Sequence, residues 1–400
     1  MYKKRAHNLA PILIAYMVLL VACNNIPLHQ LLSSPPTETI VNSCIPPITP
    51  FAFSVKPVVP TGQEKRVAIL PPEPWQVEAQ LPALANGALQ TSRILSVRTK
   101  NGYSEVWIRR QWTLIGEYNN QATEELWIYQ ADTKKWVSMP EQIGNTDIRI
   151  GELFLAKDGS LWSHNYISKS GEPLFSIYNE RTNRFDLAVG SKGIPDGKVV
   201  LDQNDVFWII PHQDSIYSYD PSTNIIKQGI TLPGLAVYGT ALGPDGTIYI
   251  LKGSSYLQTS NDEELLHFYP QTDKVDEIGV PFQPPLIFLN LLVDHSGRLW
   301  LDDRGWMEPG GAWYEVVRSP IFITNNLESG SGYQWETPSI LLESSDGRLW
   351  FQSNNGLAWL DPQKGEWCWF TTYKSNIVED QQHNLWMIAD NKLYEYSLNQ

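Results

Sequence analysis

Residues 340–370 read ILLESSDGRLWFQSNNGLAWLDPQKGEWCWF and contain the clearest copy of a unit that recurs along this chain. The pair Asp346-Gly347 predicts a tight hairpin turn, because such a turn needs a positive φ that glycine adopts without steric cost. Pro362 is expected to end a strand, since proline cannot donate to a ladder. The expected antiparallel strands are 340–343, 348–352, 357–361 and 366–370.

The centre of this unit, a turn followed by an apolar residue and an aromatic residue, occurs six times, and a looser seventh copy (YSEVW) ends at Trp107. The copies end at Trp107, Trp162, Trp208, Tyr249, Trp300, Trp350 and Trp386. Most of their spacings are close to the ~40–50 residues of a propeller blade. One such sheet has two apolar faces that it cannot bury alone, whereas blades packed around an axis bury both. The repeat predicts an all-β chain, a seven-bladed β-propeller of four-stranded antiparallel blades with the repeated aromatics between blades.

The two ends of the repeat region predict how the ring closes. The last repeat has room for only three strands before Gln400, the last being 392–396. The segment at about 75–80 (WQVEAQ) is similar to the fourth strands of the other repeats. We therefore expect this N-terminal strand to complete the last blade.

The beginning of the chain has the pattern of an export signal. A positive head of Lys3, Lys4 and Arg5 precedes an apolar run over 9–22 that is too short to span a bilayer. The run ends in LVAC, which resembles the lipobox of bacterial lipoproteins. The resemblance implies cleavage between Ala22 and Cys23 and a diacylglyceryl group on Cys23. An ordinary secretory signal with an incidental cysteine is the alternative.

These patterns predict three regions and a location. The regions are a lipoprotein signal peptide (1–22), a lipidated Pro/Ser-rich tether (23–65) and the propeller (66–400). The mature protein is expected outside the cytoplasm, attached to a bacterial cell membrane by its lipid anchor, and the sequence leaves open which membrane.

Charge and cysteine content narrow the partners. The net charge is −13, and loss of three basic residues with the signal peptide changes it to −16. Such acidity argues against nucleic acid, which needs a basic footprint. If Cys23 carries lipid, Cys44 and Cys368 remain, and the sequence leaves open whether they pair. No CxxC or other metal-ligand spacing occurs.

Two resemblances to known propellers follow from individual repeats. VDHSGRLWL (293–301) and ESSDGRLWFQSNNGLAWLDP (343–362) resemble the two-component regulator propeller repeat. That family implies an extracytoplasmic propeller, usually the sensor part of a membrane-bound histidine kinase, but these 400 residues contain no kinase sequence, so direct signalling is not expected of them. GPDGTIYI (243–250) with FYPQTDK (268–274) resembles virginiamycin B lyase, whose metal and His/Glu constellation has no residue-by-residue match here.

Ligand sites of propellers usually lie at one mouth of the central channel. They are formed by the loops after second strands and the loops that lead into inner strands. The candidate ligand-binding residues there are His164, Tyr166, His212, Asp302, Arg304, Trp306 and Trp335. Aromatic and polar side chains in such a pocket suit a sugar or another polar ligand. Solvated loops without a binding role are the alternative.

The histidines raise a second possibility. His164 and His212 occupy nearly matching positions in neighbouring repeats, which would permit shared metal binding or acid–base chemistry. No third ligand is evident, and no catalytic residue, metal ligand or cofactor is assigned. We expect a monomeric, non-enzymatic module that binds an unknown small molecule, glycan or protein. A propeller-type lyase or hydrolase with a metal-assisted site at the channel mouth remains the alternative.

Overall fold

The structure is a computed structural model in which parts of the chain are described. These parts are residues 42–45, 75–83, 88–114, 123–139, 142–143, 146–167, 173–188, 193–211, 215–232, 236–253, 263–281, 290–302, 304–315, 323–324, 334–335, 339–353, 356–370, 376–389 and 391–398. Among these residues there is no helix, and hence none long and apolar enough to cross a membrane.

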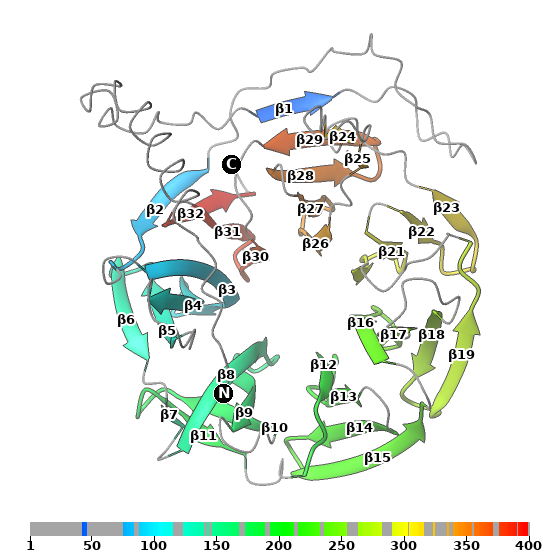
Figure 1. Ribbon diagram of the computed structural model, residues 1–400, viewed down its shortest axis with the longest axis horizontal. Helices are drawn as coiled ribbons and strands as arrows, with labels where there is room; N and C mark the ends of the chain where they lie inside the picture. The colour runs from blue at the N-terminus through cyan, green and yellow to red at the C-terminus, as the bar shows by residue number, and fades with distance from the viewer. Residues whose placement is uncertain are drawn as a thin grey trace, which may run out of the picture. The chain divides into compact units, whose positions relative to one another are not determined.

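The strands form seven antiparallel blades around a central opening, as predicted (Figure 1). Blade one contains β3 (Ala88–Lys100), β4 (Tyr103–Leu114), β5 (Thr123–Gln130) and β6 (Lys135–Met139). Blade two contains β7 (Gln142–Ile143), β8 (Thr146–Leu155), β9 (Leu161–Ile167), β10 (Pro173–Asn179) and β11 (Arg184–Leu187). Blade three contains β12 (Gly197–Leu201), β13 (Phe207–Pro211), β14 (Ser215–Asp220) and β15 (Ile225–Thr231).

The remaining blades follow the same order from the inner to the outer strand. Blade four contains β16 (Ala236–Leu242), β17 (Ile248–Gly253), β18 (Glu264–Tyr269) and β19 (Lys274–Ile278), and blade five contains β20 (Leu291–Val293), β21 (Leu299–Leu301), β22 (Gly305–Met307) and β23 (Trp313–Glu315). A short hairpin, β24 (Ile323–Thr324) and β25 (Gln334–Trp335), comes next. Blade six contains β26 (Ser339–Glu343), β27 (Leu349–Ser353), β28 (Gly356–Asp361) and β29 (Glu366–Phe370), and blade seven contains β30 (Ile377–Glu379), β31 (Asn384–Ala389) and β32 (Lys392–Ser397).

An N-terminal strand closes the ring, which confirms the prediction. β2 (Gln76–Gln80) pairs antiparallel with β32 and supplies the fourth strand of blade seven. It also contacts blade one: the Tyr129 hydroxyl donates to Glu78 Oε1 at 2.9 Å, and Trp136 Nε1 donates to the Gln80 carbonyl at 2.9 Å. Residues from the two ends of the chain therefore hold the first and last blades together.

The recurring turn is stabilised by one buried carboxylate. Asp294 Oδ1 accepts the backbone N–H groups of Ser296 and Arg298, at 2.9 and 3.0 Å. Its Oδ2 accepts the indole N–H of Trp300, six residues along the chain, at 2.9 Å. The same Asp–Trp bond joins Asp202 to Trp208 and Asp380 to Trp386. The aspartate thus fixes both the turn and the orientation of the tryptophan that packs between blades.

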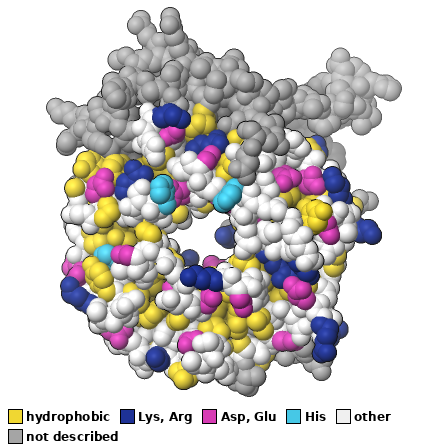
Figure 2. Space-filling model, turned by 180° about the vertical axis from the view of Figure 1, so that it is seen from behind, with side chains coloured by type: hydrophobic (Ala, Val, Ile, Leu, Met, Phe, Trp, Pro, Cys, Tyr) yellow, Lys and Arg dark blue, Asp and Glu magenta, His cyan; other side chains and the backbone are white. Residues whose placement is uncertain are grey.

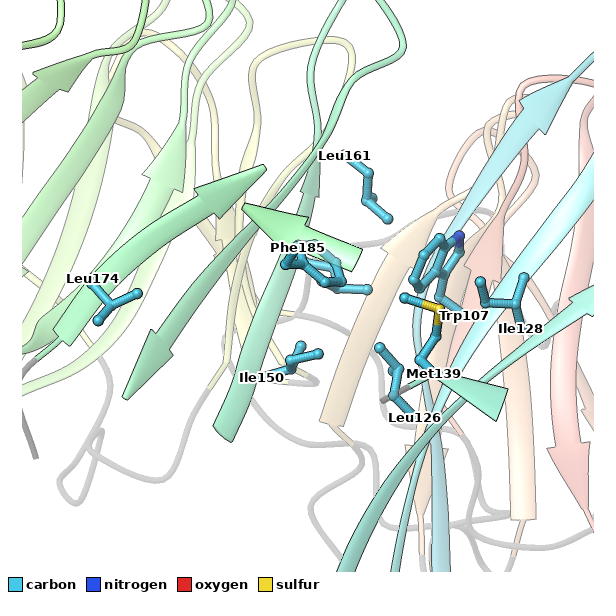
Figure 3. Close-up of a cluster of buried hydrophobic side chains, with 9 residues drawn as sticks. Trp107, Leu126, Ile128, Met139, Ile150, Leu161, Leu174 and Phe185 are labelled. Atoms are coloured by element: carbon cyan, nitrogen blue, oxygen red, sulfur yellow. The ribbon is translucent and has the colours of Figure 1, made fainter. Parts of the chain in front are cut away.

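The hydrophobic core lies between neighbouring blades rather than at the centre of the ring. Figure 3 shows one such cluster, in which Trp107 of blade one faces side chains of blade two. Trp107 is fully buried and meets the rings of Tyr178 and Phe185 edge-on, at 4.8 and 5.9 Å between centroids. Burying large aromatic side chains contributes several kcal/mol per residue to folding. The prediction that the repeated aromatics form inter-blade core is confirmed.

One strand has no counterpart in the sequence-based expectations. β1 (Asn42–Ile45) pairs antiparallel with the outer strand β29, within the segment 23–65 predicted to be a tether. The ladder sets the backbone of Cys44 directly opposite Cys368. The Cys368 side chain is buried and disulfide-bonded. Blade six therefore has five strands, and the segment expected to be a tether contributes one of them.

Candidate functional site

A cavity of about 330 Å³ opens where the inner parts of blades one, two and three meet. Its lining residues are Arg93, Arg109, Gly151, Glu152, His164, Asp196, Gly197 and Lys198. They come from β3 and β4 of blade one, β8 and β9 of blade two, and the start of β12 in blade three. The volume is at the lower end of the ~300–1,000 Å³ of small-ligand pockets. Charged side chains of both signs also gather at the mouth of the central opening in Figure 2.

Two arginines form the blade-one wall of this cavity. Arg93 and Arg109 are direct partners across the β3–β4 ladder, so their side chains project from the same face. Arg109 Nη1 reaches the carbonyl oxygen of Ile150 in blade two at 3.4 Å. Within the described part of the chain, the Arg93 side chain has no ion pair or hydrogen bond. The wall thus presents two guanidinium groups, neither of which forms an ion pair with a described carboxylate.

Blade two contributes a carboxylate and an imidazole. Glu152 lies opposite His164 across the β8–β9 ladder, directly after a register irregularity between Ile150 and Glu152. His164 is only 1% exposed, and its ring lies 5.1 Å from that of Phe175. Burial lowers the pKa of His164 from 6.5 to about 4, although the charge of Asp196 opposes this shift. The imidazole is therefore neutral at pH 7.

Blade three completes the cavity through three consecutive residues. Gly197 pairs with Pro211, and a Cβ at Gly197 would lie 2.5 Å from the carbonyl oxygen of Ile210. Any other residue there would push the first two strands of the blade apart. Asp196 and Lys198 flank this close approach and both line the cavity. The Lys198 side chain forms no ion pair with any residue in the ranges that the structure describes.

Of the seven sequence-predicted candidates, the structure places His164 in this cavity. Tyr166 lies in β9 and Trp335 in β25, but the side chains of both are outside the described set. His212 follows β13 and also lies outside the described residues, so the expected pairing of His164 with His212 stays a prediction. No group of three His, Cys, Asp or Glu among the described residues could hold a metal ion.

The three candidates in blade five lie apart from the cavity. Asp302 is buried, and its carboxylate accepts the backbone N–H groups of Asn290 and Ile340 at 2.8 and 2.7 Å. This bond pattern joins blade five to the inner strand of blade six. Arg304 is partly buried in the turn that enters β22.

Trp306 occupies the third strand of blade five rather than an exposed loop. It is 5% exposed and stacks on Trp300 and Tyr314, with ring centroids 5.7 and 4.4 Å away. The sequence analysis listed it among the candidate ligand-binding residues of the channel mouth. The structure shows it in a buried hydrophobic cluster with residues of blades five and six.

Several cavity residues were missed by the sequence analysis. They are Arg93, Arg109, Glu152, Asp196 and Lys198. One signal was available, because Arg109 follows Trp107 by two residues just as His164 follows Trp162. Comparing the same position in every repeat would have joined these two side chains in one candidate site.

No family model and no curated protein matches the chain. The chain is similar to two structures of the extracellular domain of BT4673 from B. thetaiotaomicron, described as a one-component and as a hybrid two-component system. The identities are 17% and 12%, and the TM-scores are 0.36 and 0.34. These matches cover 77% and 74% of this chain but only 40% and 50% of those domains.

A third similar structure is that of YCF48 bound to D1 peptide. It has 13% identity and a TM-score of 0.51, and the match covers 82% of this chain and 96% of the other. At this identity the likeness shows the fold, which agrees with the seven blades described above.

Proposed function

We propose that this chain is an extracytoplasmic, lipid-anchored propeller that binds a polar ligand or a partner protein and is not an enzyme. The observation that carries the proposal is the cavity where blades one, two and three meet, whose three cationic side chains outnumber its two carboxylates. Charged groups are costly to hold near one another without a counter-charge, so such a site suits a ligand that supplies one.

Two further observations support the location. The LVAC motif at residues 20–23 resembles a lipobox. The disulfide-bonded state of Cys368 fits an oxidising compartment, because disulfides persist outside the cytoplasm and are rare within it. A propeller of similar fold, YCF48, has been seen with a bound peptide, which supports a binding role without identifying a ligand for this chain.

The anchor is tested by metabolic labelling with palmitate in a bacterial host. We expect label in the membrane-bound wild-type chain and none after Cys23→Ser. Cys44→Ser is the matched control, since it removes a cysteine that should keep no lipid. Label retained in the Cys23→Ser chain would overturn the lipoprotein assignment.

Binding is tested by thermal shift of the intact chain, purified in detergent, against oligosaccharides, short peptides and divalent cations. A ligand at 100 times its dissociation constant should stabilise the fold by about 2.7 kcal/mol. A rise in melting temperature with one class, without chemical change of the compound, is the expected result. Failure of every class would contradict small-ligand binding.

A catalytic role is the second candidate, and one observation favours it. His164 faces the cavity as a neutral imidazole, since burial lowers its pKa to about 4. A neutral imidazole can accept a proton. Turnover of a bound compound that disappears in a His164→Gln chain would support this lyase or hydrolase over the binding module.

A further inference from the structure

The cavity has an unusual charge arrangement that points to one chemical class of ligand. Arg93 and Arg109 are directly opposed across two strands, where like charges destabilise a sheet. Lys198 adds a third cation from blade three. Neither Arg93 nor Lys198 forms an ion pair with a described residue, so both side chains are available to a ligand.

The acidic groups at the cavity limit how much negative charge a ligand can bring. Glu152 and Asp196 line the same space, and His164 is neutral because burial lowers its pKa to about 4. Three cations against two carboxylates leave a single positive charge. A monoanion balances this charge, whereas a phosphate dianion would exceed it and be repelled by the two acids.

We propose that the cavity binds a carboxylate group of a ligand, held by the guanidinium groups of Arg93 and Arg109 and by the ammonium group of Lys198. The inference rests on the proposed binding function and names its ligand class. Guanidinium groups bind the two oxygens of a carboxylate through paired N–H donors, which adds both energy and orientation. Glu152 also lines the cavity, and its negative charge repels the anion.

The available volume sets the size of the group that enters. About 330 Å³ accommodates one sugar acid or the terminal residue of a peptide. The carboxylate can therefore come from a uronic acid or from a peptide C-terminus. Both sources present the same two oxygens, and the experiment separates them.

The experiment is calorimetric titration of the intact chain in detergent at pH 7 with two matched pairs of probes. One pair is galacturonate and its methyl ester, and the other is an N-acetylated tripeptide of uncharged residues with a free C-terminus and its amide. We expect one free acid to bind and its neutral partner to bind at least tenfold more weakly, since bonds between ionised groups are the strong ones. The acid that binds identifies the source.

Three variants test whether these residues act through their charge, because a purely structural role would not change the affinity in opposite directions. Arg109→Gln should weaken binding of the acid about tenfold or more, whereas Glu152→Gln should strengthen it by several-fold because a repelling charge is lost. Arg184→Gln, which removes an exposed arginine from the outer strand β11, should change nothing. Loss of binding in both cavity variants would contradict the charge argument.

The failure of this inference differs from the failure of the binding function. Equal binding of acid and neutral partner, or an Arg109→Gln chain with unchanged affinity, overturns the carboxylate site while leaving a binding module. If neither acid binds, the carboxylate site is also overturned, and the broader thermal-shift panel alone decides the proposed function.

Discussion

Arg93 and Arg109 lie directly opposite each other on β3 and β4, with both side chains in the wall of the same cavity. Like charges at directly opposed positions of a sheet reduce stability by a few tenths to about 1 kcal/mol. An arrangement that costs stability in the free protein is typical of a site shaped for binding rather than for folding.

The first prediction follows from this cost. Arg93→Gln should raise the free energy of unfolding of the free chain by about 0.5 kcal/mol, because it removes the repulsion with Arg109. Urea denaturation measures the change, with Arg184→Gln as a charge-matched control away from the cavity. Destabilisation of the Arg93→Gln chain would mean that the arginine has a structural role.

The second prediction concerns acid stability. Folding lowers the pKa of His164 from 6.5 to about 4, so between these values the unfolded chain binds a proton that the folded chain does not. The contribution of the neutral His164 to the free energy of unfolding is therefore fully present above pH 6.5. It is lost as the pH falls towards 4, which lowers the free energy of unfolding by up to about 3 kcal/mol. His164→Asn should show a smaller difference in unfolding free energy between pH 7.5 and pH 4.5. An unchanged difference would contradict the burial of a neutral imidazole.

The third prediction addresses the recurring turn. Asp294 accepts four hydrogen bonds, including those from Arg298 Nε at 2.6 Å and Trp300 Nε1 at 2.9 Å, and is 1% exposed. Asp294→Ala should destabilise the chain by about 3 kcal/mol, because it leaves buried donors without an acceptor. Asp158→Ala is the control. This turn residue is exposed and caps the Ser160 N–H, so its loss should cost about 0.5 kcal/mol.

The fourth prediction concerns the strand β1. Cys368 is disulfide-bonded and the backbone of Cys44 lies opposite it, so we expect these two cysteines to form the bond. Peptide mapping without reductant should recover a linked pair from residues around 44 and 368. A Cys368 peptide linked to Cys23 would contradict this pairing and also the lipid anchor.

The repeat made the fold predictable because its information is local. The turn and the aromatic residue recur in the same order at similar intervals along the chain, and the strand expected at 357–361 is observed as Gly356–Asp361. Ring closure by β2 was predictable as well, since three strands in the last repeat leave one place to fill. Gly347 has the positive φ, 82°, that the turn required.

Features that depend on long-range contacts were not predictable in the same way. β1 is four residues long and shows no hydrophobic alternation, so only its pairing with β29 reveals it. The cavity joins side chains of three blades, and His164 was the one predicted in advance. The register irregularity after Ile150 changes which β8 side chains face the cavity, and periodicity alone does not locate it.

Hydrogen exchange of the intact chain, with and without the compound that gives the largest thermal shift, tests the central claim most directly. If the cavity is the binding site, slower exchange should be confined to peptides covering residues 88–111, 146–167 and 193–201, which contain its lining. Protection confined to blades four to six would contradict the account, because the ligand would then bind elsewhere on the ring.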